Sequence, residues 1–418
     1  MRVLVVGSGA REHALAWKLA AANGVQAVWT APGNAGTAEE GRNLTQVAAD
    51  DGAALSAAAR SNAIDLAVIG PDDALEAGVA DSLRAAGLAV VGPSAAEARL
   101  ESSKAFCKSF LLRHDIPTAQ ATELHDQEEL QLLLRSRSGP VVLKMDGLAQ
   151  GKGVLVSDDG DALLHFGRAA LARGTLLAEE YLSGYELSLF LLLDGTRAVG
   201  LPLCSDFKRA GTGDTGPNTG GMGAICPVPW VDAALAARID REITQPTVRG
   251  LQQDGLLYRG VLYIGLMITR DGPRVLEFNV RLGDPEAQVL LPLLTTDAGE
   301  LMEAVATGTL SQVEVTCSSG SAVTVVVAAQ GYPGSYEKGL AVASLPAADR
   351  RGVVFHATTS RDAGTLRTGG GRSFAVTGLG EDLATAQANA YQLVRQVRFP
   401  GAWWRTDIGT RFLTPTPA

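Results

Sequence analysis

The chain has 418 residues, of which 46% are hydrophobic, 19% charged and 5% aromatic, and its formal net charge is −9. This length exceeds what one hydrophobic core supports, so we expect two to four domains, and the negative charge argues against a general nucleic-acid surface. Four widely spaced cysteines argue against a zinc ribbon and fit a reducing compartment, and no leader segment or membrane-length apolar run is visible, so we expect a cytoplasmic protein.

The first 91 residues alternate between apolar runs and helical stretches. The expected strands are 2–6, 25–29, 64–69 and 88–91, and the expected helices between them are 13–22, 51–61 and 74–86. This alternation predicts an α/β domain over residues 1–103 with a doubly wound parallel sheet. Such a sheet binds ligands at the carboxyl ends of its strands, where we expect the loops 7–12, 32–37 and 70–73.

The first turn has the sequence Gly7-Ser8-Gly9-Ala10-Arg11-Glu12. Glu12 stands where the dinucleotide fingerprint has its third glycine, which weakens a nicotinamide interpretation. The turn nevertheless directs backbone N–H groups at a possible anion, with Arg11 as added charge. A plain strand-to-helix turn explains the same residues equally well.

A lysine- and glycine-rich segment follows two expected helices, 95–114 and 126–137. Residues 140–156 read as strand, glycine-rich loop and strand, with Lys144 ending the first strand. No Gly-Lys-Ser/Thr opens a helix here, so the segment is not a P-loop. Lys144 and Lys152 among several glycines favour a lid over a triphosphate, in preference to an ordinary polar hairpin.

Two strands and a long glycine-rich segment come next. The strands 176–182 and 186–193 are unremarkable alone, although the backbone of 180–182 suits an adenine and Glu186 suits ribose hydroxyls. The segment 206–223 is expected to lack regular structure. Loops of this length in compact domains are functional or disordered, and its polar side chains and glycines favour a substrate loop.

The stretch from Glu277 to Glu286 is the strongest chemical signal. A helix at 231–254 and a hairpin of 260–269 with 273–280 lead into it. Glu277 and Asn279 lie two apart on a strand, so they share one face and offer hard oxygen ligands to a magnesium-like ion. Arg281 continues that face with a fork of donors. An isolated Glu-x-Asn is more often an ordinary strand end, and the charged residues that follow favour the metal interpretation.

The last hundred residues change pattern again. After helices at 288–294 and 297–306, strands are expected at 322–329, 353–357 and 374–377, with a tight loop at 369–372 and a helix at 383–398. We therefore expect a central domain over 104–317, with a lid at about 118–190, and a small C-terminal α+β domain over 318–418.

The metal pair, the lysines, the glycine lid and the substrate loop together resemble the ATP-grasp superfamily. Within it, the chain is similar to the glycinamide ribonucleotide synthetase family over essentially its whole length. The matching segments are Gly7–Leu15, Pro32–Thr37, Lys144–Gly153, Gly216–Gly223, Glu277–Gln288, Gly331–Gly334 and Arg405–Gly409. The departures from the usual family residues are Met145, Phe207, Leu282, Asp72 and Ala74, and none removes a metal ligand or a phosphate lysine.

This resemblance implies an ATP-grasp core of two α+β subdomains and a specific reaction. ATP, glycine and 5-phosphoribosylamine would give glycinamide ribonucleotide, ADP and phosphate through glycyl phosphate, as a step of purine biosynthesis. The metal, Mg²⁺ or Mn²⁺, would be held by Glu277 and Asn279. The implied nucleotide contacts are Lys104, Lys144, Gly151, Lys152 and Gly153 for the phosphates, Glu179, Glu180, Tyr181 and Leu182 for adenine, and Glu186 for ribose.

The resemblance also assigns the catalytic and substrate positions. The implied catalytic residues are Arg281, Lys144 and Asp284, with Arg281 stabilising the acyl phosphate. The implied substrate contacts are Asp206, Lys208, Asn218, Thr219, Gly220, Gly221 and Arg281, with Gly9, Arg11 and Arg372 as candidates for the ribose phosphate. No side-chain nucleophile is required, in agreement with the lack of a Ser-His-Asp or Cys-His pattern.

Three alternatives remain open from the sequence. One is another ATP-grasp carboxylate–amine ligase of nucleotide metabolism, which has the same chemistry and a different substrate. The second is a nicotinamide-dependent dehydrogenase built on the first sheet. The third is a nucleotide-binding module without catalysis. In each case we expect a monomer whose partners are small molecules, with no nucleic-acid or membrane partner.

Overall fold

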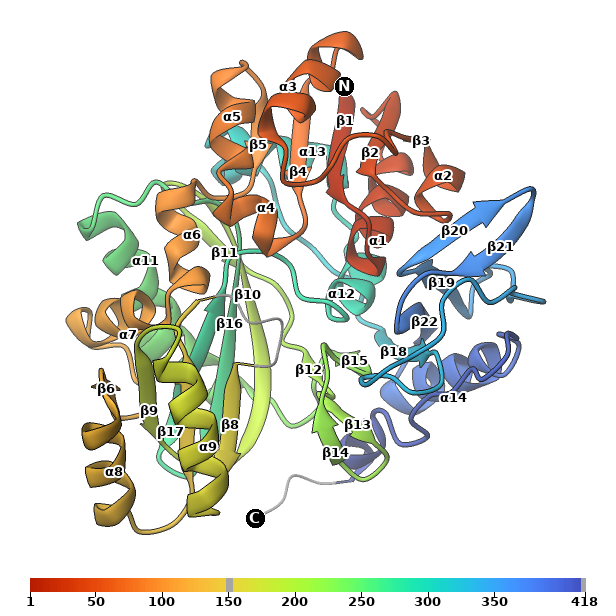
Figure 1. Ribbon diagram of the computed structural model, residues 1–418. Helices are drawn as coiled ribbons and strands as arrows, with labels where there is room; N and C mark the ends of the chain where they lie inside the picture. Colours follow the sequence, from red (N-terminus) through yellow and green to blue (C-terminus); the bar gives the residue numbers. More distant parts are fainter. Residues whose placement is uncertain (148–152, 415–418) are drawn as a thin grey trace.

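The computed structural model describes residues 1–147 and 153–414 (Figure 1). Its N-terminal part is a parallel sheet in the order β3-β2-β1-β4-β5. The strands are β1 (Arg2–Gly7), β2 (Ala27–Pro32), β3 (Arg42–Asn43), β4 (Leu66–Ile69) and β5 (Ala89–Val91). The helices are α1 (Ala10–Ala20), α2 (Thr37–Glu40), α3 (Gly52–Ser61), α4 (Asp72–Glu76) and α5 (Val79–Ala85). The predicted doubly wound sheet is confirmed, and apart from the short edge strand β3 its strands are almost fully buried.

One predicted helix of this part is two helices. The expected helix 74–86 divides between α4 and α5, because Gly78 has φ +75° and ends the first regular segment. That left-handed conformation is accessible to glycine without steric cost. The break turns the chain between the two helices, so that α5 packs against both α3 and β5.

The central part is built on an antiparallel sheet in the order β11-β10-β16-β17. Its strands are β10 (Tyr185–Asp194), β11 (Ala198–Gly200), β16 (Arg259–Thr269) and β17 (Gly272–Asn279). Its helical segments are α6 (Ala95–Ser102), α7 (Lys104–Arg113), α10 (Ala233–Ile239), η1 (Asp240–Thr244) and α11 (Gln245–Gln253). Both α6 and α7 pack against β17. The single helix expected over 231–254 therefore contains a π-helical turn, η1, in its middle.

The single helix expected at 95–114 is also interrupted. Ser103 has extended backbone angles (φ −127°, ψ 110°) and its hydroxyl accepts a hydrogen bond from the Phe106 N–H. A serine in this position is a helix N-cap, so it ends α6 and starts α7. As a result, Lys104 is the first residue of α7 and lies at the positive end of its dipole.

A second antiparallel sheet, β6-β9-β7-β8, lies within residues 118–190, the segment predicted to be a lid and called the lid below. Its elements are β6 (Ala121–Leu124), α8 (Gln127–Ser136), β7 (Val141–Met145), β8 (Val154–Ser157), α9 (Gly160–Leu171) and β9 (Leu176–Glu180). Leu130, Leu143, Leu163 and Leu176 belong to a hydrophobic cluster of the lid alone. Figure 1 shows α8 and α9 on the outside of this sheet, which faces β17. A separate cluster indicates that the lid packs as a unit of its own.

The third sheet, β12-β15-β18-β22-β19, joins the central part to the C-terminal part. Its strands are β12 (Ser205–Asp206), β15 (Gly223–Cys226), β18 (Ser321–Ala328), β19 (Gly352–His356) and β22 (Arg372–Gly380). The helical segments after β17 are α12 (Ala287–Leu293), α13 (Ala298–Thr307), η2 (Leu310–Gln312), α14 (Leu383–Val394) and η3 (Thr410–Leu413). β15 pairs with β18, so the sheet runs across the expected boundary at residue 318.

The substrate-loop segment 206–223 is more ordered than its glycine content suggested. It contains the hairpin of β13 (Arg209–Gly211) and β14 (Thr215–Asn218), and a second short hairpin, β20 (Thr359–Asp362) with β21 (Thr365–Thr368), lies in the C-terminal part. The expectation of a structureless loop was wrong. Periodicity analysis needs longer strands than these to detect them. Among the described residues, no helix has the length and apolar character to cross a membrane.

Candidate active site

The last two polar side chains of β17, Glu277 and Asn279, lie next to each other at the end of the strand. The side chain of Glu277 is exposed, Asn279 is only 8% exposed, and the Asn279 amide donates to Glu277 Oε1 over 3.5 Å. No group of three or more His, Cys, Asp and Glu residues in 1–147 and 153–414 is arranged to hold a metal ion. A carboxylate and an amide oxygen side by side suit a hard cation that takes its remaining ligands from water and phosphate.

Arg281 lies beside this pair and is held by a residue that sequence analysis missed. Its Nη2 contacts Glu101 Oε1 at 2.7 Å and Asn279 Oδ1 at 3.1 Å, and the N–H of Val280 donates to Glu101 Oε2. Burial raises the pKa of Glu101, and Arg281 opposes that shift. Burial also works against the charged form of Arg281, but Glu101, Asp72 and Glu286 together outweigh it and raise the pKa of the guanidinium. No motif marks Glu101, because only the packing of α6 on β17 brings it here.

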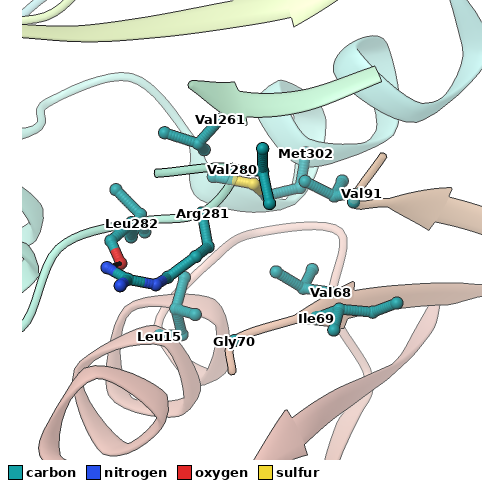
Figure 2. Close-up of a pocket in the computed structure, with 11 residues that line it drawn as sticks. Leu15, Val68, Ile69, Gly70, Val91, Val261, Val280, Arg281, Leu282 and Met302 are labelled. Carbon is teal, nitrogen blue, oxygen red and sulfur yellow. Dashed lines mark hydrogen bonds between the residues drawn. The ribbon is translucent and has the colours of Figure 1, made fainter. Parts of the chain in front are cut away.

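Arg281 also borders a cavity at the carboxyl edge of the N-terminal sheet. Figure 2 shows its guanidinium between Leu282 and Leu15. The rest of the lining comes from strand ends and α13, and consists of Val68, Ile69, Gly70, Val91, Gly92, Val261, Val280 and Met302. Among the described residues, Arg281 Nε is buried without a hydrogen-bond partner. The end of β17 therefore lies at the sheet edge where α/β folds bind ligands.

The phosphate lysines predicted from the sequence lie close to Glu277 and Asn279. Lys144 Nζ donates to the carbonyl of Leu276 over 2.9 Å and forms an ion pair with Glu179 Oε2 at 2.7 Å. Lys104 donates through Nζ to the carbonyl of Gly147, and its backbone N–H donates to Asp146 Oδ1. Burial lowers the pKa of Lys104, while Glu277 is the largest influence in the other direction.

Glu179 is engaged differently from what the resemblance implied. Its carboxylate is buried between Lys144 and Lys108, with Lys108 Nζ 2.7 Å from Oε1. The side chain is therefore committed to lysines, which leaves the chain near Glu180, Tyr181 and Leu182 as the candidate adenine contact. Lys108 was not identified from the sequence, although it lies four residues after Lys104 and hence on the same face of α7.

Other implied nucleotide contacts are placed as follows. Gly151 and Lys152 lie outside the described residues. Gly153 accepts a hydrogen bond at its carbonyl from the N–H of Met145, which closes the base of the β7–β8 hairpin. Glu180 accepts from the N–H of Gln120, and Tyr181 is 50% exposed.

A cluster of charges surrounds Lys208 below β10. Lys208 Nζ contacts Glu186 Oε2 at 2.7 Å and Asp206 Oδ1 at 2.9 Å. The lysine lowers the pKa of Glu186, whereas burial raises the pKa of Asp206. Burial also raises the pKa of Glu286 to about 7, with Asp206 adding to the shift, and its Oε1 accepts from Ser188 Oγ over 3.1 Å. Glu186, Asp206 and Lys208 thus form one polar group that links the implied ribose and substrate positions.

The implied substrate residues converge from three parts of the chain. Arg372 Nη1 donates to the carbonyls of Gly220 and Asp284 and lies 3.3 Å from Asp284 Oδ1. A side chain at Gly9 would lie 3.6 Å from Asp284 Oδ2, so the first turn of the chain faces the same carboxylate. Although burial works against it, Arg372 and Arg11 hold the pKa of Asp284 below its usual value. Asp284, which is half-buried, is therefore held in its ionised form by the two arginines.

The loop 219–221 is tied down on both sides of this cluster. Thr219 Oγ1 donates to the carbonyl of Lys208 and accepts from the N–H of Gly221. The N–H of Gly220 donates to the hydroxyl of Tyr332. Asn218, by contrast, pairs with Arg209 in the exposed hairpin β13–β14. Gly221 has φ +108° and a side chain there would collide with Pro285, so only glycine fits.

The first turn is closed by Glu12 rather than open to an anion. The Gly9 N–H donates to Glu12 Oε2 over 2.6 Å, and Arg11 Nε contacts Glu12 Oε1 at 2.6 Å. A side chain at Gly70 would lie 2.0 Å from Glu12 Oε1, so this carboxylate fills the space between the ends of β1 and β4. A dinucleotide pyrophosphate would need that space, which counts against the dehydrogenase alternative.

Phe207, a departure from the family pattern, has a structural role. It is 2% exposed, and the guanidinium groups of Arg405 and Arg411 lie over its ring at 5.3 and 4.7 Å. Cation–π contacts of this kind hold the C-terminal tail against the substrate loop.

Comparison with known proteins gives consistent results along the chain. The phosphoribosylglycinamide synthetase family models match residues 1–101 (N domain), 102–287 (ATP-grasp domain) and 322–411 (C domain). A relative from Agrobacterium fabrum, named phosphoribosylamine–glycine ligase, is 45% identical over 98% of both chains. A relative of that name from Allochromatium vinosum is 46% identical, again over 98% of both chains.

Solved structures agree with these matches. The crystal structure of a phosphoribosylamine–glycine ligase from Thermotoga maritima covers 98% of this chain and 100% of its own, with a TM-score of 0.85 and 36% identity. A biotin carboxylase domain from Hydrogenobacter thermophilus covers 96% of this chain and 91% of its own, with a TM-score of 0.72 at 15% identity, which shows a shared fold.

The fold and the site together define the class of protein. A lid sheet facing an antiparallel sheet, with paired metal-type ligands at the end of β17 and lysines beside them, is the arrangement of an ATP-grasp ligase. Within that class, the chain belongs to the phosphoribosylglycinamide synthetase family.

Proposed function

We propose that this chain joins glycine to 5-phosphoribosylamine with ATP, giving glycinamide ribonucleotide, ADP and phosphate. The observation that carries the proposal is the continuous segment from Leu276 to Asp284. One end contacts a lysine of the lid, and the other end contacts Arg372 of the C-terminal part. A nucleotide at the first end and an amino acid at the second would place the γ-phosphoryl group next to a carboxylate.

The chemistry requires activation of a carboxylate that does not react with amines in water. In the proposed course, the glycine carboxylate takes the γ-phosphoryl group, and the amine of 5-phosphoribosylamine then attacks the glycyl phosphate and releases phosphate. Such transfers depend mainly on positioning and charge neutralisation. We assign Lys104 and Lys144 to the phosphates, Arg281 to the acyl phosphate and Asp284 to the glycine ammonium group.

The metal ligands fit this course. ATP-grasp proteins use ATP with divalent metal ions, and Glu277 with Asn279 provides the hard oxygen donors that Mg²⁺ or Mn²⁺ accepts. When bound, the ion would neutralise charge between the phosphates. Within the chain, Lys144 contacts the carbonyl of Leu276, next to Glu277, and Arg281 contacts the side chain of Asn279.

The remaining assignments follow from the same arrangement. We place the ribose of the nucleotide at Glu186 and the substrates along Asp206, Lys208 and the loop 218–221. We assign the ribose phosphate of the second substrate to the region of Gly9, Arg11 and Arg372. We keep the domain limits 1–103, 104–317 and 318–418, and we propose that the protein is a monomer. Its four free cysteines are consistent with the reducing conditions of the cytoplasm, where we expect it to act.

The proposal is tested by measuring how ADP release depends on the amine substrate, 5-phosphoribosylamine, and on the carboxylate substrate, glycine. We expect ADP release only when glycine and 5-phosphoribosylamine are both present with a divalent ion, and a product with the mass of glycinamide ribonucleotide. ADP release with another small carboxylate but not glycine would favour the first alternative. ATP binding without any ADP release would identify a binding module, and reduction of a nicotinamide would identify a dehydrogenase.

A further inference from the structure

The two lysines that flank Glu179 have different surroundings. Lys108 Nζ lies 2.7 Å from Glu179 Oε1, 2.8 Å from Thr118 Oγ1 and 3.0 Å from the carbonyl of Ala119. An ammonium group has three donors, so Lys108 is saturated by the protein. Among the described residues, Lys144 has two acceptors, Glu179 and the carbonyl of Leu276, which leaves one donor for a ligand.

These contacts close a ring that connects four separate elements. Lys144 of β7 contacts Glu179 of β9, Glu179 contacts Lys108 of α7, and Lys108 contacts Thr118 at the entrance to the lid. Thr118 Oγ1 then donates to the carbonyl of Val275 over 2.8 Å, next to the Leu276 carbonyl that receives Lys144. The ring begins and ends on the strand that carries Glu277.

The charges of the ring suggest what it does. Two cations and one anion leave one net positive charge, and all three groups are at most 8% exposed. Without Lys108, Glu179 and Lys144 would form a neutral pair, and the cavity would offer no net charge from this source to a triphosphate. Buried charges interact strongly over several ångströms because little water screens them.

We propose that Lys108 is a positioning residue for nucleotide binding: it neutralises Glu179 so that the charge of Lys144 is available to the phosphates. Lys108 touches neither substrate nor metal in this scheme and acts through Glu179 and Lys144. The inference rests on the proposed nucleotide site and adds to it a residue that sets the strength of ATP binding.

The test compares the ATP affinity of three variants with that of a control variant, in which a half-buried lysine far from the site is removed. Lys108→Met removes the charge and keeps the length of the side chain. Glu179→Gln removes the anion, and the double variant removes both, which restores one net charge on Lys144. Lys18→Met is the control, because Lys18 lies in α1 and donates to the carbonyl of Leu294, away from the site.

We expect Lys108→Met to raise the dissociation constant of magnesium ATP by roughly tenfold to a hundredfold and to leave the KM for glycine nearly unchanged. Glu179→Gln should bind ATP at least as tightly as the native chain. The ATP affinity of the double variant should return to within a fewfold of the native affinity. The Lys18→Met control should bind ATP with the native affinity. Calorimetric titration of each folded variant gives the dissociation constants for magnesium ATP without any need for turnover, and initial rates at varied glycine give the KM.

Two results would overturn the inference. One is native ATP affinity in Lys108→Met, and the other is a double variant as weak as Lys108→Met, since a purely structural lysine would not be rescued by removing its partner. If Lys108→Met does not fold, the double variant and Glu179→Gln still decide the question, because neither keeps a buried carboxylate without partners. Failure of glycinamide ribonucleotide synthesis by the native chain would contradict the proposed function and would leave these binding constants to be judged separately.

Discussion

At the scale of single residues, Glu277 is the side chain whose loss is most informative. It is exposed, and among the described residues its one side-chain hydrogen bond is the long 3.5 Å contact from the Asn279 amide, so its removal should cost little stability. We expect Glu277→Ala to keep the native melting temperature and to lower turnover by roughly a thousandfold or more, because charge neutralisation at phosphates is lost. Steady-state rates at saturating magnesium measure this.

An exposed glutamate of α13, Glu303, serves as the matched control for Glu277. Glu303→Ala should leave turnover within twofold of the native rate. Turnover of Glu277→Ala close to that of Glu303→Ala would remove the metal assignment.

Glu286 connects a single residue to the pH dependence of stability. Its folded pKa of about 7 lies above the ordinary glutamate pKa of 4.5, so the native state binds more protons than the unfolded state between these values. The stability it contributes is therefore present at low pH and falls as pH rises from about 4.5 through 7. Glu286→Gln keeps an acceptor for Ser188 and cannot ionise.

We expect Glu286→Gln to remove this pH dependence. Relative to the native chain it should gain up to roughly 3 kcal/mol between pH 5 and pH 8, from the size of the pKa shift. Urea unfolding at the two pH values gives the difference. Parallel stability curves for the two proteins would show that Glu286 does not titrate in this range.

At the scale of elements, the break between α6 and α7 determines where both lysines of α7 lie. Ser103 caps α7, and its hydroxyl also contacts Asp146, the residue that receives the Lys104 N–H. We expect Ser103→Ala to cost about 1 kcal/mol of stability and to raise the KM for ATP several fold. Chemical denaturation and initial rates at varied ATP measure the two effects.

The cap of α14 provides a matched control for Ser103. Asp382 accepts from the N–H of Thr385 at the start of that helix, in the C-terminal part. Asp382→Ala should cost a similar free energy and leave the KM for ATP unchanged. An equal rise of that KM in both variants would mean that it reflects general destabilisation.

At the scale of the whole molecule, the residues proposed to bind the substrates include one from the C-terminal part. Arg372 lies at the start of β22, and its guanidinium reaches Gly220 and Asp284 of the central part. We expect Arg372→Ala to raise the KM for glycine and 5-phosphoribosylamine by roughly tenfold to a hundredfold, the effect of losing a half-buried charge contact. ATP affinity should stay native, because the lysines of the nucleotide site are untouched.

Arg351 is the control for Arg372, since it is exposed and pairs only with Asp349 among the described residues. Arg351→Ala should leave all three constants unchanged. A loss of ATP affinity in Arg372→Ala, or native constants for the two substrates, would place the substrate cluster elsewhere.

The sequence by itself determined the class of fold and the chemistry of the site. Buried apolar runs predicted the parallel sheet, and the two-residue spacing of Glu277 and Asn279 predicted a shared face, because both depend only on local periodicity. Lys144 was predicted from its position at the end of a strand beside a glycine-rich loop, whereas the role of Lys104 was implied by the family resemblance.

Only the tertiary structure decided which partners these side chains have. Glu101 and Lys108 carry no motif, and the sequence marked Glu12 only as a replacement for a fingerprint glycine. Each contacts a residue on another element: Glu12 fills the space against Gly70, Glu101 holds Arg281, and Lys108 holds Glu179. Charge pairing depends on distances in space, which local periodicity does not encode. For that reason the sequence indicated the reaction, whereas the packing of α6, α7 and the C-terminal sheet set the charge that each residue presents to it.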